Sequence, residues 1–595
     1  MAVEKLITDH FDTWTSALQT RSTAGRGSNG KIDLYGIKKL RELILELAVR
    51  GKLVPQDPND EPASELLKRI AAEKVELVKQ GKIKKQKPLA EISEDEKPFE
   101  LPVGWEFCQL GDFANIVRGI TFPGNEKSKE ASNNKIACLR TANIQENIDW
   151  NDLIYVPKEF IKRNDQILLN NDIVMSMANS RELVGKVALA TIPNKNTVTF
   201  GGFLSVLRPI IIDPKFLMLL LRCDTNKSQL IESSSQTTNI ANISLAKLNP
   251  LIVGLPPLAE QAKITNSVDE LLSICDQLEQ QSLTSLEAHS QLVETLLATL
   301  TDSKNAEELA ENWTRISQHF DTLFTTEASI DALKQTILQL AVMGKLVPQD
   351  PNDEPASELL KRIEQEKAQL VKEGKIKKQK PLPPVSDEEK PFELPEGWEW
   401  CRFEDTVDIQ SGITKGRNLV GRELISVPYL RVANVQRGYL DLSEIKKIDI
   451  PADEKDKYQV KVNDLLITEG GDWDTVGRTA VWTDSSFYMA NQNHVFKARP
   501  IMNELNVKWV EIFMNSSVSR KYFASASKQT TNLASINKTQ LRGCFIALPP
   551  ISESSRILDQ YMSLLNLCDG LKSQLQSAQQ TQLHLANVLT DAALS

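Results

Sequence analysis

Few side chains in this sequence are spaced in a way that would support catalysis. The acidic pair Asp453-Glu454, followed by Lys455, resembles a nuclease carboxylate cluster, but charged surface turns give the same run freely. The five histidines are scattered without an H-E-x-x-H motif, and there is no G-x-x-x-x-G-K-[ST] phosphate loop. An Asn/Asp-Pro-Pro-aromatic motif of the amino-methyltransferase type is also missing. We therefore predict a non-catalytic chain.

The cysteines and the hydropathy of the chain favour a protein of a reducing compartment. The seven cysteines form no C-x-x-C pair, which argues against a zinc site and a disulfide framework. No stretch reaches the roughly 18 apolar residues of a membrane span, and the charged N-terminus is unlike a secretory signal. We expect reduced, mostly buried cysteines, no membrane partner and a cytoplasmic location.

Framing sequences reveal that the whole chain is an internal repeat. Matching segments share an offset of 293 residues: 51–70 with 344–363, 81–89 with 374–382, 96–102 with 389–395, 236–243 with 529–536, and 255–264 with 548–557. The first of these matches is an identity over 20 residues. The chain is thus two copies of one unit, each of about 290 residues.

Between the framing segments the two copies differ strongly. Scattered anchors survive: Gly119-Ile120-Thr121 with Gly412-Ile413-Thr414, Leu139-Arg140 and Ala142-Asn143 with Leu430-Arg431 and Ala433-Asn434, and Asn171-Asp172 with Asn463-Asp464. Duplication followed by drift also produces repeats, but drift alone should not spare 20 consecutive residues beside a divergent block. The frame therefore meets one requirement twice, whereas the inserts do related but different jobs.

Charge is distributed unevenly between frame and inserts. Residues 107–253 carry 16 Lys and Arg against 13 Asp and Glu, and residues 400–546 carry 20 against 17. Each insert is therefore at +3, which leaves −15 for the remaining residues of a chain whose net charge is −9. Phosphate neutralisation supplies much of the affinity of DNA-binding proteins. The balance suits a protein whose partners supply further basic surface.

Long helices are predicted after each Leu-Pro-Pro. In the second copy, spacings of four and three alternate as in a heptad seam: Ile557, Tyr561, Leu564, Cys568, Leu571, Leu575, Ala578, Gln582, Leu585 and Leu589. The first copy has a polar middle: Ile264, Val268, Leu271, Cys275, Leu278, Ser282, Ser285, His289, Leu292 and Leu296. About 40 helical residues span roughly 60 Å. The seam needs a partner helix, and the other copy offers one, antiparallel or parallel.

The frame and the inserts show different local patterns. Segments 36–50 and 329–343 are predicted helices that end at Gly51 and Gly344, and each ASELLKRI begins another helix. The basic GKIKKQK runs are either solvated linkers or contacts for phosphate or an acidic partner. In the inserts we expect strands over 172–176, 186–190, 462–467 and 478–482, joined by polar loops, which indicates a mixed α+β fold.

The ends of the inserts carry a family resemblance. LPVGWEFCQLGDFANIVRGIT (101–121) and LPEGWEWCRFEDTVDIQSGIT (394–414) resemble the start of a target-recognition domain in specificity subunits of Type I restriction-modification enzymes. The sequence QTTN, then LPPLAEQ and a long helix, resembles the end of such a domain. The second end departs from this pattern, because LPPISESSRI keeps Glu553 but lacks the following glutamine. The resemblance covers nearly the whole chain.

The resemblance implies an α+β fold with two α/β target-recognition domains, braced by two long coiled-coil helices in a pseudo-twofold internal repeat. It implies these boundaries: helical region 1–100, recognition domain 101–257, central helices and linker 258–393, recognition domain 394–550, and C-terminal helix 551–595. Each recognition domain would contact one half of a two-part site in double-stranded DNA, with an unread spacer. Half-sites on one DNA face lie about one helical turn apart.

The resemblance also implies partners and cofactors. The helical frame would dock two methyltransferase subunits, and restriction/translocase subunits would join that core. S-adenosylmethionine, ATP and magnesium would bind those partners and not this chain. Two other functions remain open at the level of sequence: a stand-alone bipartite DNA-binding adaptor, which the acidic balance disfavours, and a scaffold that binds no DNA, which two unlike inserts disfavour.

Base reading requires polar side chains on loops that reach a DNA groove. The candidates in the first insert are Thr121, Arg140, Asn143, Asn179, Arg181, Lys186, Gln236, Thr237 and Thr238. In the second insert they are Thr414, Lys415, Arg431, Asn434, Asp472, Trp473, Arg478, Gln529, Thr530 and Thr531. Residues shared by both copies can instead hold the fold or meet phosphate. Sequence-specific readers should differ between the copies, which favours Arg181 and Trp473.

Overall fold

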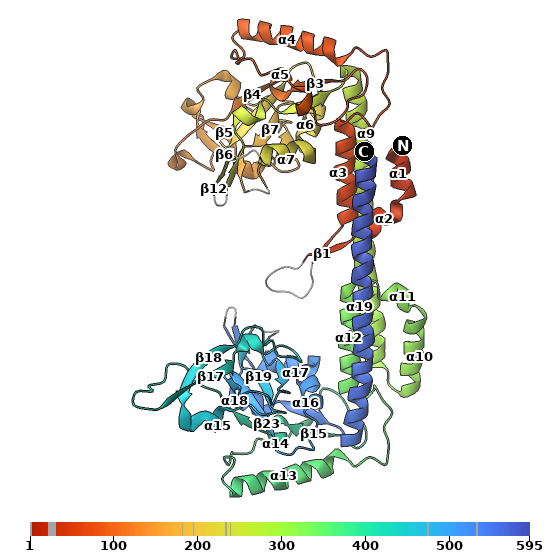
Figure 1. Ribbon diagram of the computed structural model, residues 1–595, viewed down its shortest axis with the longest axis vertical. Helices are drawn as coiled ribbons and strands as arrows, with labels where there is room; N and C mark the ends of the chain where they lie inside the picture. The colour runs from red at the N-terminus through yellow and green to blue at the C-terminus, as the bar shows by residue number, and fades with distance from the viewer. Residues whose placement is uncertain are drawn as a thin grey trace. The chain divides into compact units, whose positions relative to one another are not determined.

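The computed structural model describes residues 3–21, 31–180, 183–193, 196–232, 235–237, 240–472, 475–530 and 533–594. The chain forms two units, one of Met1–Leu286 with Ser577–Ser595 and one of Glu287–Gln576. Each unit combines one mixed recognition domain with a set of helices (Figure 1). The limits of these units fall inside two of the five expected regions, 258–393 and 551–595, because each long helix begins in one unit and ends in the other. The five regions themselves stay predictions.

Unit 1 begins with helices and a short hairpin. These elements are α1 (Val3–Asp9), α2 (Phe11–Ser16), β1 (Gln19–Arg21), β2 (Lys31–Asp33), α3 (Tyr35–Val49) and α4 (Ala63–Lys79). The recognition domain follows: β3 (Glu106–Gln109), α5 (Leu110–Phe113), β4 (Ala114–Arg118), β5 (Lys135–Leu139), β6 (Ile154–Pro157), β7 (Ile173–Ser176), β8 (Ala178–Asn179), β9 (Val187–Leu189), β10 (Val198–Phe200), β11 (Leu204–Pro209), α6 (Pro214–Arg222), α7 (Asp224–Glu232), β12 (Ser235–Thr237), β13 (Ile240–Asn242), α8 (Leu245–Leu248) and β14 (Ile252–Leu255).

Unit 2 contains the equivalent elements. Its helices are α10 (Ala306–Gln318), α11 (Phe320–Leu323), α12 (Glu327–Val342) and α13 (Ala356–Lys372). Its recognition domain comprises β15 (Glu399–Arg402), α14 (Phe403–Thr406), β16 (Val407–Gln410), β17 (Leu424–Leu430), β18 (Lys446–Pro451), α15 (Lys455–Tyr458), β19 (Leu465–Thr468), β20 (Gly470–Gly471), β21 (Thr479–Val481), β22 (Ala490–Asn491), β23 (Val495–Pro500), α16 (Val507–Met514), α17 (Ser517–Ala526), β24 (Lys528–Thr530), β25 (Leu533–Ser535), α18 (Lys538–Gly543) and β26 (Phe545–Leu548).

The two recognition domains share one sheet topology. A four-stranded sheet has the order β4-β11-β7-β9 in unit 1 and β16-β23-β19-β21 in unit 2. A second sheet, β10-β5-β6, corresponds to β22-β17-β18. The first and last strands of each domain pair antiparallel, β3 with β14 and β15 with β26. Each insert therefore closes on itself, and its two ends leave side by side toward the helices.

The frame helices form where the sequence predicts them. Helices α3 and α12 end just before Gly51 and Gly344, whose φ angles are +68° and +70°. A Cβ atom at Gly51 would lie 2.4 Å from Pro102 Cγ, so glycine is required there by both backbone and space. The GKIKKQK runs that follow α4 and α13 are mostly exposed, and their function stays a prediction.

The long helices α9 (Leu258–Asp302) and α19 (Ile551–Leu594) contain 45 and 44 residues. The predicted seam is correct through Leu278 and Leu575, and beyond them it is correct at some positions, such as Ser282 and Leu589, and wrong at others. Leu292 is 51% exposed, whereas Val293, Leu297 and Leu300 are buried. Leu585 is likewise 42% exposed, whereas its neighbour Ala586 is buried.

The buried stripe of the helix leaves the heptad spacing after Leu278. Its next half-buried positions, Ser282 and Leu286, follow in two successive steps of four residues, whereas a heptad alternates steps of four and three. Equivalent seam positions then recur after eleven residues, as from Leu286 to Leu297. An eleven-residue repeat gives 3.67 residues per turn, close to the natural helix, so the buried stripe continues without a left-handed supercoil.

Antiparallel packing of the long helices is visible inside unit 1. Gln56 Nε2 donates a hydrogen bond to Glu260 Oε1 (3.2 Å), near the start of α9. Close by in the chain, Lys52 Nζ donates to the carbonyl oxygen of Leu594 (2.8 Å), at the end of α19. The start of α9 and the end of α19 therefore lie at the same end of α3, which settles the orientation that the sequence left open.

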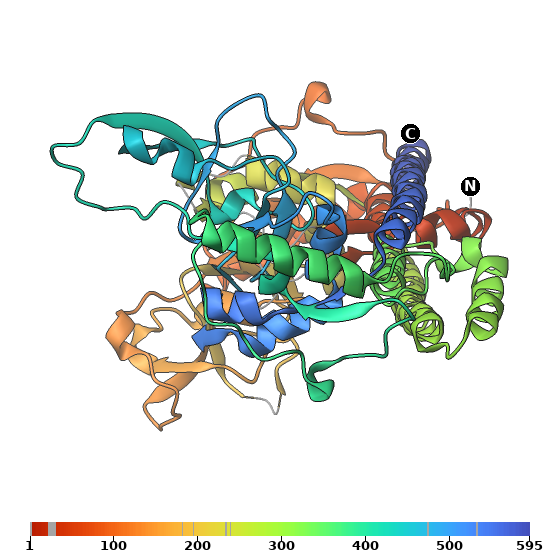
Figure 2. The same cartoon turned by 90° about the horizontal axis from the view of Figure 1, so that it is seen from below.

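Unit 2 repeats this arrangement with the roles of the long helices exchanged. Gln349 Nε2 donates to Glu553 Oε1 (3.1 Å), near the start of α19. Lys345 Nζ donates to the carbonyl oxygen of Ser303 (2.8 Å), just past the end of α9. Helices α10 and α11 lie on the side of the helices that faces away from this unit's recognition domain (Figures 1 and 2).

The altered sequence after the second Leu-Pro-Pro keeps its contacts. In unit 1, Gln261 Oε1 accepts a hydrogen bond from the backbone N–H of Asp213, the N-cap of α6 (2.8 Å). In unit 2, Ser554 Oγ accepts one from the side chain of Asn506, the N-cap of α16 (3.3 Å). Both pairs join the long helix to the equivalent helix of the recognition domain.

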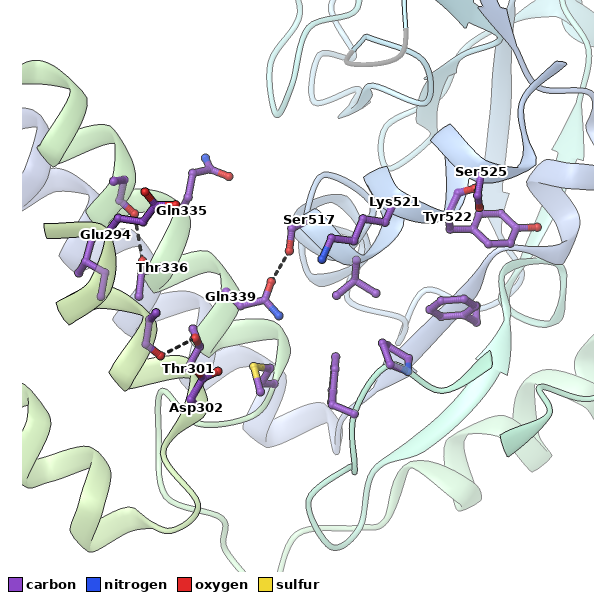
Figure 3. Close-up of a pocket in the computed structure, with 18 residues that line it drawn as sticks. Glu294, Thr301, Asp302, Gln335, Thr336, Gln339, Ser517, Lys521, Tyr522 and Ser525 are labelled. Carbon is purple, nitrogen blue, oxygen red and sulfur yellow. Dashed lines mark hydrogen bonds between the residues drawn. The ribbon is translucent and has the colours of Figure 1, made fainter. Parts of the chain in front are cut away.

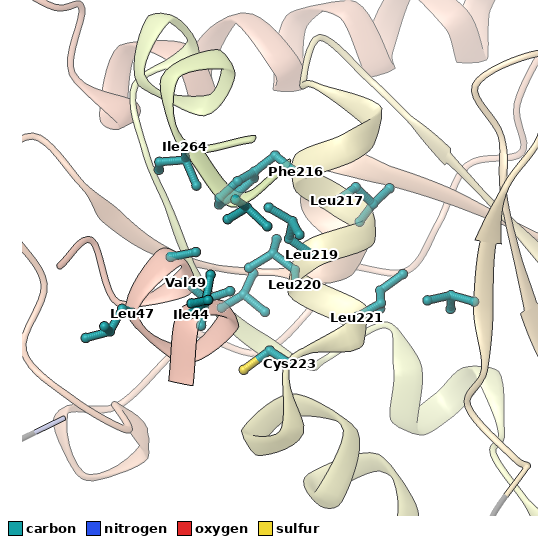
Figure 4. Packing of buried hydrophobic residues seen from close by; sticks show 14 of the residues in the cluster. Ile44, Leu47, Val49, Phe216, Leu217, Leu219, Leu220, Leu221, Cys223 and Ile264 are labelled. Carbon is teal, nitrogen blue, oxygen red and sulfur yellow. The ribbon is translucent and has the colours of Figure 1, made fainter. Parts of the chain in front are cut away.

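In unit 1 the recognition domain packs against the frame helix α3 through apolar and polar contacts. Ile44 and Leu47 of α3 pack in one cluster with Phe216 and Leu220 of α6 (Figure 4). Beside them, buried Glu46 accepts hydrogen bonds from Cys223 Sγ (2.9 Å) and from the Thr225 N–H (2.9 Å). Burial alone would raise the pKa of Glu46, but these hydrogen bonds outweigh it and lower that pKa.

In unit 2 helices α12 and α16 also pack in one buried apolar cluster, but the interface has a hollow beside them. A hollow of about 810 Å³ lies between α12, the end of α9 and α17 (Figure 3). Gln339 stands where unit 1 has Glu46, and it accepts a hydrogen bond from Ser517 Oγ across one side of the hollow. Met343, Phe392 and Tyr522 line its apolar part.

The surviving anchors of the inserts hold the fold. A Cβ atom at Gly119 would lie 2.2 Å from the carbonyl oxygen of Gly201, and one at Gly412 would lie 2.2 Å from that of Asn491. Asn463 has a left-handed φ of +72°. This turn precedes β19, so the strand predicted from residue 462 begins only at Leu465.

Lys497 in β23 is an unusual core residue, because the equivalent residue of β11 is Val206. The Lys497 side chain is buried, and its Nζ donates to the carbonyl oxygen of Gln459 (2.9 Å). Burial lowers the pKa of Lys497 to about 8. Below that pH the folded state holds a buried ammonium ion, whereas the unfolded state keeps its proton up to about pH 10.4. The free energy of unfolding should therefore rise between about pH 8 and 10.

We expect Lys497→Met to stabilise the protein by about 1–3 kcal/mol at pH 7, and the gain should shrink toward pH 10. Denaturant unfolding of the full chain at both pH values measures this. The control Lys361→Met removes an exposed lysine of α13 and should change the stability by less than about 0.5 kcal/mol. A gain that stays constant between pH 7 and pH 10 would contradict the burial of charge as its cause.

Candidate nucleic-acid interface

A small sheet in each recognition domain joins two candidate loops that are far apart in sequence. In unit 1 its order is β12-β13-β8, so the hairpin that contains Gln236 and Thr237 pairs with the strand that contains Asn179. In unit 2 the order is β24-β25-β20, so β25, which pairs with the strand of Gln529 and Thr530, also pairs with β20, which Asp472 follows. The structure thus places the strands of these candidates in one small sheet of each domain.

A second group forms around a glutamine that the sequence analysis did not single out. In unit 1, Lys186 Nζ donates a hydrogen bond to Gln145 Oε1 (3.0 Å). The Gln145 amide nitrogen donates to the carbonyl oxygen of Ala142 (3.0 Å), which fixes which end of the amide faces the lysine. Gln145 is exposed, and Lys186 is half-buried beside it. The pair therefore presents donors and an amide at the surface.

Unit 2 contains an equivalent glutamine–cation group in which an arginine replaces the lysine. Arg478 Nη1 donates to Gln436 Oε1 (2.8 Å), and Gln436 Nε2 donates to the carbonyl oxygen of Ala433 (2.8 Å). The backbone of Arg478 pairs with Thr468 as that of Lys186 pairs with Ser176. The two cations therefore occupy equivalent places, at the ends of equivalent loops.

A further arginine accompanies each pair, but it comes from a different element in each copy. In unit 1, Arg222 at the end of α6 donates to the carbonyl oxygen of Glu146. In unit 2 the residue equivalent to Glu146 is Arg437, which donates to the carbonyl oxygen of Asn515, the residue equivalent to Arg222 (3.5 Å). The arginine thus comes from the end of α6 in unit 1 and from the loop after the glutamine in unit 2, and both units keep a hydrogen bond between these two segments.

One pair of candidates, Asn143 and Asn434, has a structural role, which corrects their assignment as base readers. Asn143 and Asn434 are 1% and 3% exposed. Their side-chain oxygens accept from the backbone N–H of Arg140 (2.8 Å) and of Arg431 (2.9 Å). Their amide nitrogens donate to loop carbonyl groups, among them that of Asp152 (3.1 Å). Buried amides with full hydrogen bonding cannot reach a base without breaking the loop that they hold.

Arg140 and Arg431 also bond within their own domains. Arg140 Nη2 forms an ion pair with Asp152 (2.6 Å), and Arg431 Nη2 forms a longer one with Glu444 (3.3 Å). Through these ion pairs, the two arginines stabilise the loop that leads to Gln145 or Gln436. The structure thus gives both arginines a role in positioning this loop, and their contact with DNA stays a prediction.

The remaining candidates lie at a different sheet. Thr121 and Thr414 are exposed, each directly after an isoleucine that bridges to the second sheet. Lys415 lies 5.2 Å from the centre of the Tyr429 ring, and both line a hollow of about 350 Å³. A cation over an aromatic ring is stabilised without an acidic partner, which leaves Lys415 suited to phosphate.

Several predictions fall outside the part of the chain that is described. Arg181, Thr238, Trp473 and Thr531 are not among the described residues, so both favoured readers stay predictions. For Gln236, Thr237, Gln529 and Thr530 the structure gives the strand position alone. Asp472 is exposed in the loop after β20, where its Oδ1 accepts from the Thr475 N–H (2.8 Å). Asn179 Oδ1 accepts from the Ser180 N–H (2.9 Å).

The sequence did hold a signal for the missed glutamines. Leu-Arg-x-Ala-Asn is followed in both copies by one residue and then Gln145 or Gln436. Extending the anchor by two positions would have found them. The exchange of Arg222 and Arg437 had no such signal, because neither residue matches its equivalent in the other copy.

Comparison with known proteins agrees with this architecture. The family model for the Type I restriction modification DNA specificity domain matches residues 102–288 and 395–577. The chain is 51% identical over 609 residues to the Type I restriction enzyme EcoEI specificity subunit of Escherichia coli, and 50% identical over 613 residues to the EcoAI specificity subunit of the same organism. Both alignments cover 100% of each chain.

A crystal structure of the HsdS subunit from Thermoanaerobacter tengcongensis aligns over 84% of this chain and 98% of its own, at 16% identity and a TM-score of 0.39. The family match covers both recognition domains and the first part of the helix that follows each, and the relatives match along their full length. The chain therefore belongs to the family of Type I restriction-modification DNA specificity subunits.

Proposed function

We propose that this chain reads an asymmetric two-part sequence in double-stranded DNA, with an unread spacer, as the specificity subunit of a Type I restriction-modification complex. One observation carries the proposal. Two recognition domains with the same topology present equivalent polar groups whose cations differ, lysine in one and arginine in the other. Equivalent scaffolds with unlike surface groups suit two different half-sequences better than one repeated sequence.

The proposal includes partners that supply the chemistry. Two methyltransferase subunits would dock on the helical frame, and restriction/translocase subunits would join them. S-adenosylmethionine, ATP and magnesium would bind those subunits, and this chain would take no catalytic part. The net charge of −9 supports this division, because the recognition domains alone carry little surplus positive charge for binding phosphate. We place the complex in the cytoplasm.

A map of methylated bases in the genome of the source strain tests the proposal. The strain with the gene should show one gapped, two-part methylated motif, and deletion of the gene should remove that motif and no other. An unchanged map in a strain whose partner methyltransferase is active would overturn the proposal. A chain that binds gapped DNA without a methyltransferase would instead be a stand-alone adaptor.

A further inference from the structure

The glutamine–cation pairs have a geometry that suits direct base recognition. We infer that Lys186 and Arg478 contact guanine at equivalent positions of the two half-sites, and that Gln145 and Gln436 position them. This inference rests on the proposed function and adds to it the residues and the base that they read.

The first support is the placement of the pairs on the domain surface. The Lys186 carbonyl oxygen accepts from the Ser176 N–H (2.9 Å), and the next residue, Met177, pairs through its carbonyl oxygen with the Ile243 N–H (2.8 Å). Ile243 directly follows β13, the second strand of the Gln-Thr-Thr hairpin. One strand segment, which contains Ser176 and Met177, therefore lies between the backbone of Lys186 and that hairpin. Unit 2 repeats the arrangement with Thr468, Glu469 and Ile536.

The second support is that each glutamine is itself fixed. Its amide nitrogen is bound to the carbonyl oxygen of an alanine, in a loop held by buried Asn143 or Asn434. Its oxygen is therefore directed at the cation. A side chain held in this way loses less conformational freedom on binding than a free lysine or arginine would.

The third support is the set of donors that remains on each cation. Lys186 Nζ has three donors, of which one is directed to Gln145 Oε1. Arg478 uses Nη1 for Gln436, and because its Nε is buried, the donors that a base could reach are the remaining ones on Nη1 and Nη2. Guanine presents two acceptors, O6 and N7, in the major groove, and lysine and arginine are the side chains that pair with them.

Within the described residues, neither pair has a carboxylate in hydrogen-bond contact with its cation, unlike Arg140, which is tied to Asp152. An arginine or lysine that is already neutralised by a carboxylate gains little from a base acceptor. The contact with a neutral glutamine orients the cation and leaves its charge available. This difference separates the readers from the positioning arginines.

The test is the methylation map produced by the full complex with single variants of this chain. Lys186→Met should relax the motif at one guanine position of one half-site, with preference for guanine there falling by about 5- to 150-fold. Arg478→Met should relax one position of the other half-site. Gln145→Ala and Gln436→Ala should affect those same positions more weakly, because they leave the cation in place but unfixed.

Two controls separate base reading from structural damage. Lys215→Met removes the same charge from an exposed lysine that pairs with Asp269 on α9 (2.6 Å), and it should leave the motif unchanged. Lys186→Arg keeps a guanine-binding donor set and should keep the motif. A Lys186→Met chain that methylates less at every site with an unaltered motif would overturn the inference, as would relaxation at adenine or in both halves. Failure of the proposed function is distinct, because the unaltered chain would then produce no gapped motif at all.

Discussion

Replacing Asp172 by alanine should destabilise the protein by about 3–5 kcal/mol. The Asp172 carboxylate is 1% exposed and forms a bidentate pair with Arg208, with both N–O distances at 2.8 Å. It also accepts a hydrogen bond from the Leu169 N–H (2.8 Å). Alanine would leave a partly buried guanidinium without its partner and a backbone donor unsatisfied.

The second copy provides an independent replicate. Asp464 pairs with Arg499 at 2.6 and 2.7 Å and caps the N–H of Lys461, so Asp464→Ala should cost a similar amount. The control Asp269→Ala breaks an exposed pair with Lys215 and should cost less than about 1 kcal/mol. Denaturant unfolding of the full chain measures all three variants. Equal, small losses for the buried and exposed pairs would contradict a structural role for these anchors.

Replacing Leu297 by alanine should cost about 2–5 kcal/mol, whereas Leu292→Ala should cost less than about 0.5 kcal/mol. Leu297 is 4% exposed in a cluster with residues of α12 and α19, and Leu292 is 51% exposed on the same helix. A strict heptad continued from Leu278 would instead bury Leu292. Denaturant unfolding of the two variants therefore decides the register of the seam, and a larger loss for Leu292→Ala would contradict the eleven-residue step.

The frame could be predicted from sequence because its signals are local. Helices α3 and α12 follow from apolar spacing and from the glycines that stop them, and the identical segments of the two copies made the repeat plain. The predicted seam was wrong at Leu292 because its register there depends on helices that are remote in sequence. Leu292 has the same apolar character as Leu297, and the packing partners alone distinguish them.

The candidate site was predicted only in part, because contacts between residues remote in sequence decide which side chains form it. Lys186 and Arg478 could be chosen as polar loop residues, but their partner glutamines lie about 40 residues away and come into contact through the fold. Asn143 and Asn434 were chosen for the same polar character, although burial makes them structural. Polarity thus identifies which side chains can bind DNA, and the fold decides which of them are free to do so.

One exchange tests the central claim that each domain reads one half of a two-part site. Residues 101–257 would be replaced by 394–550, with the joints in the Leu-Pro and Leu-Pro-Pro sequences that both copies share. The methylation map of the complex with this chain should lose the first half-sequence and show a gapped motif that contains the second half-sequence twice. Methylation of the original asymmetric motif by the exchanged chain would contradict the account.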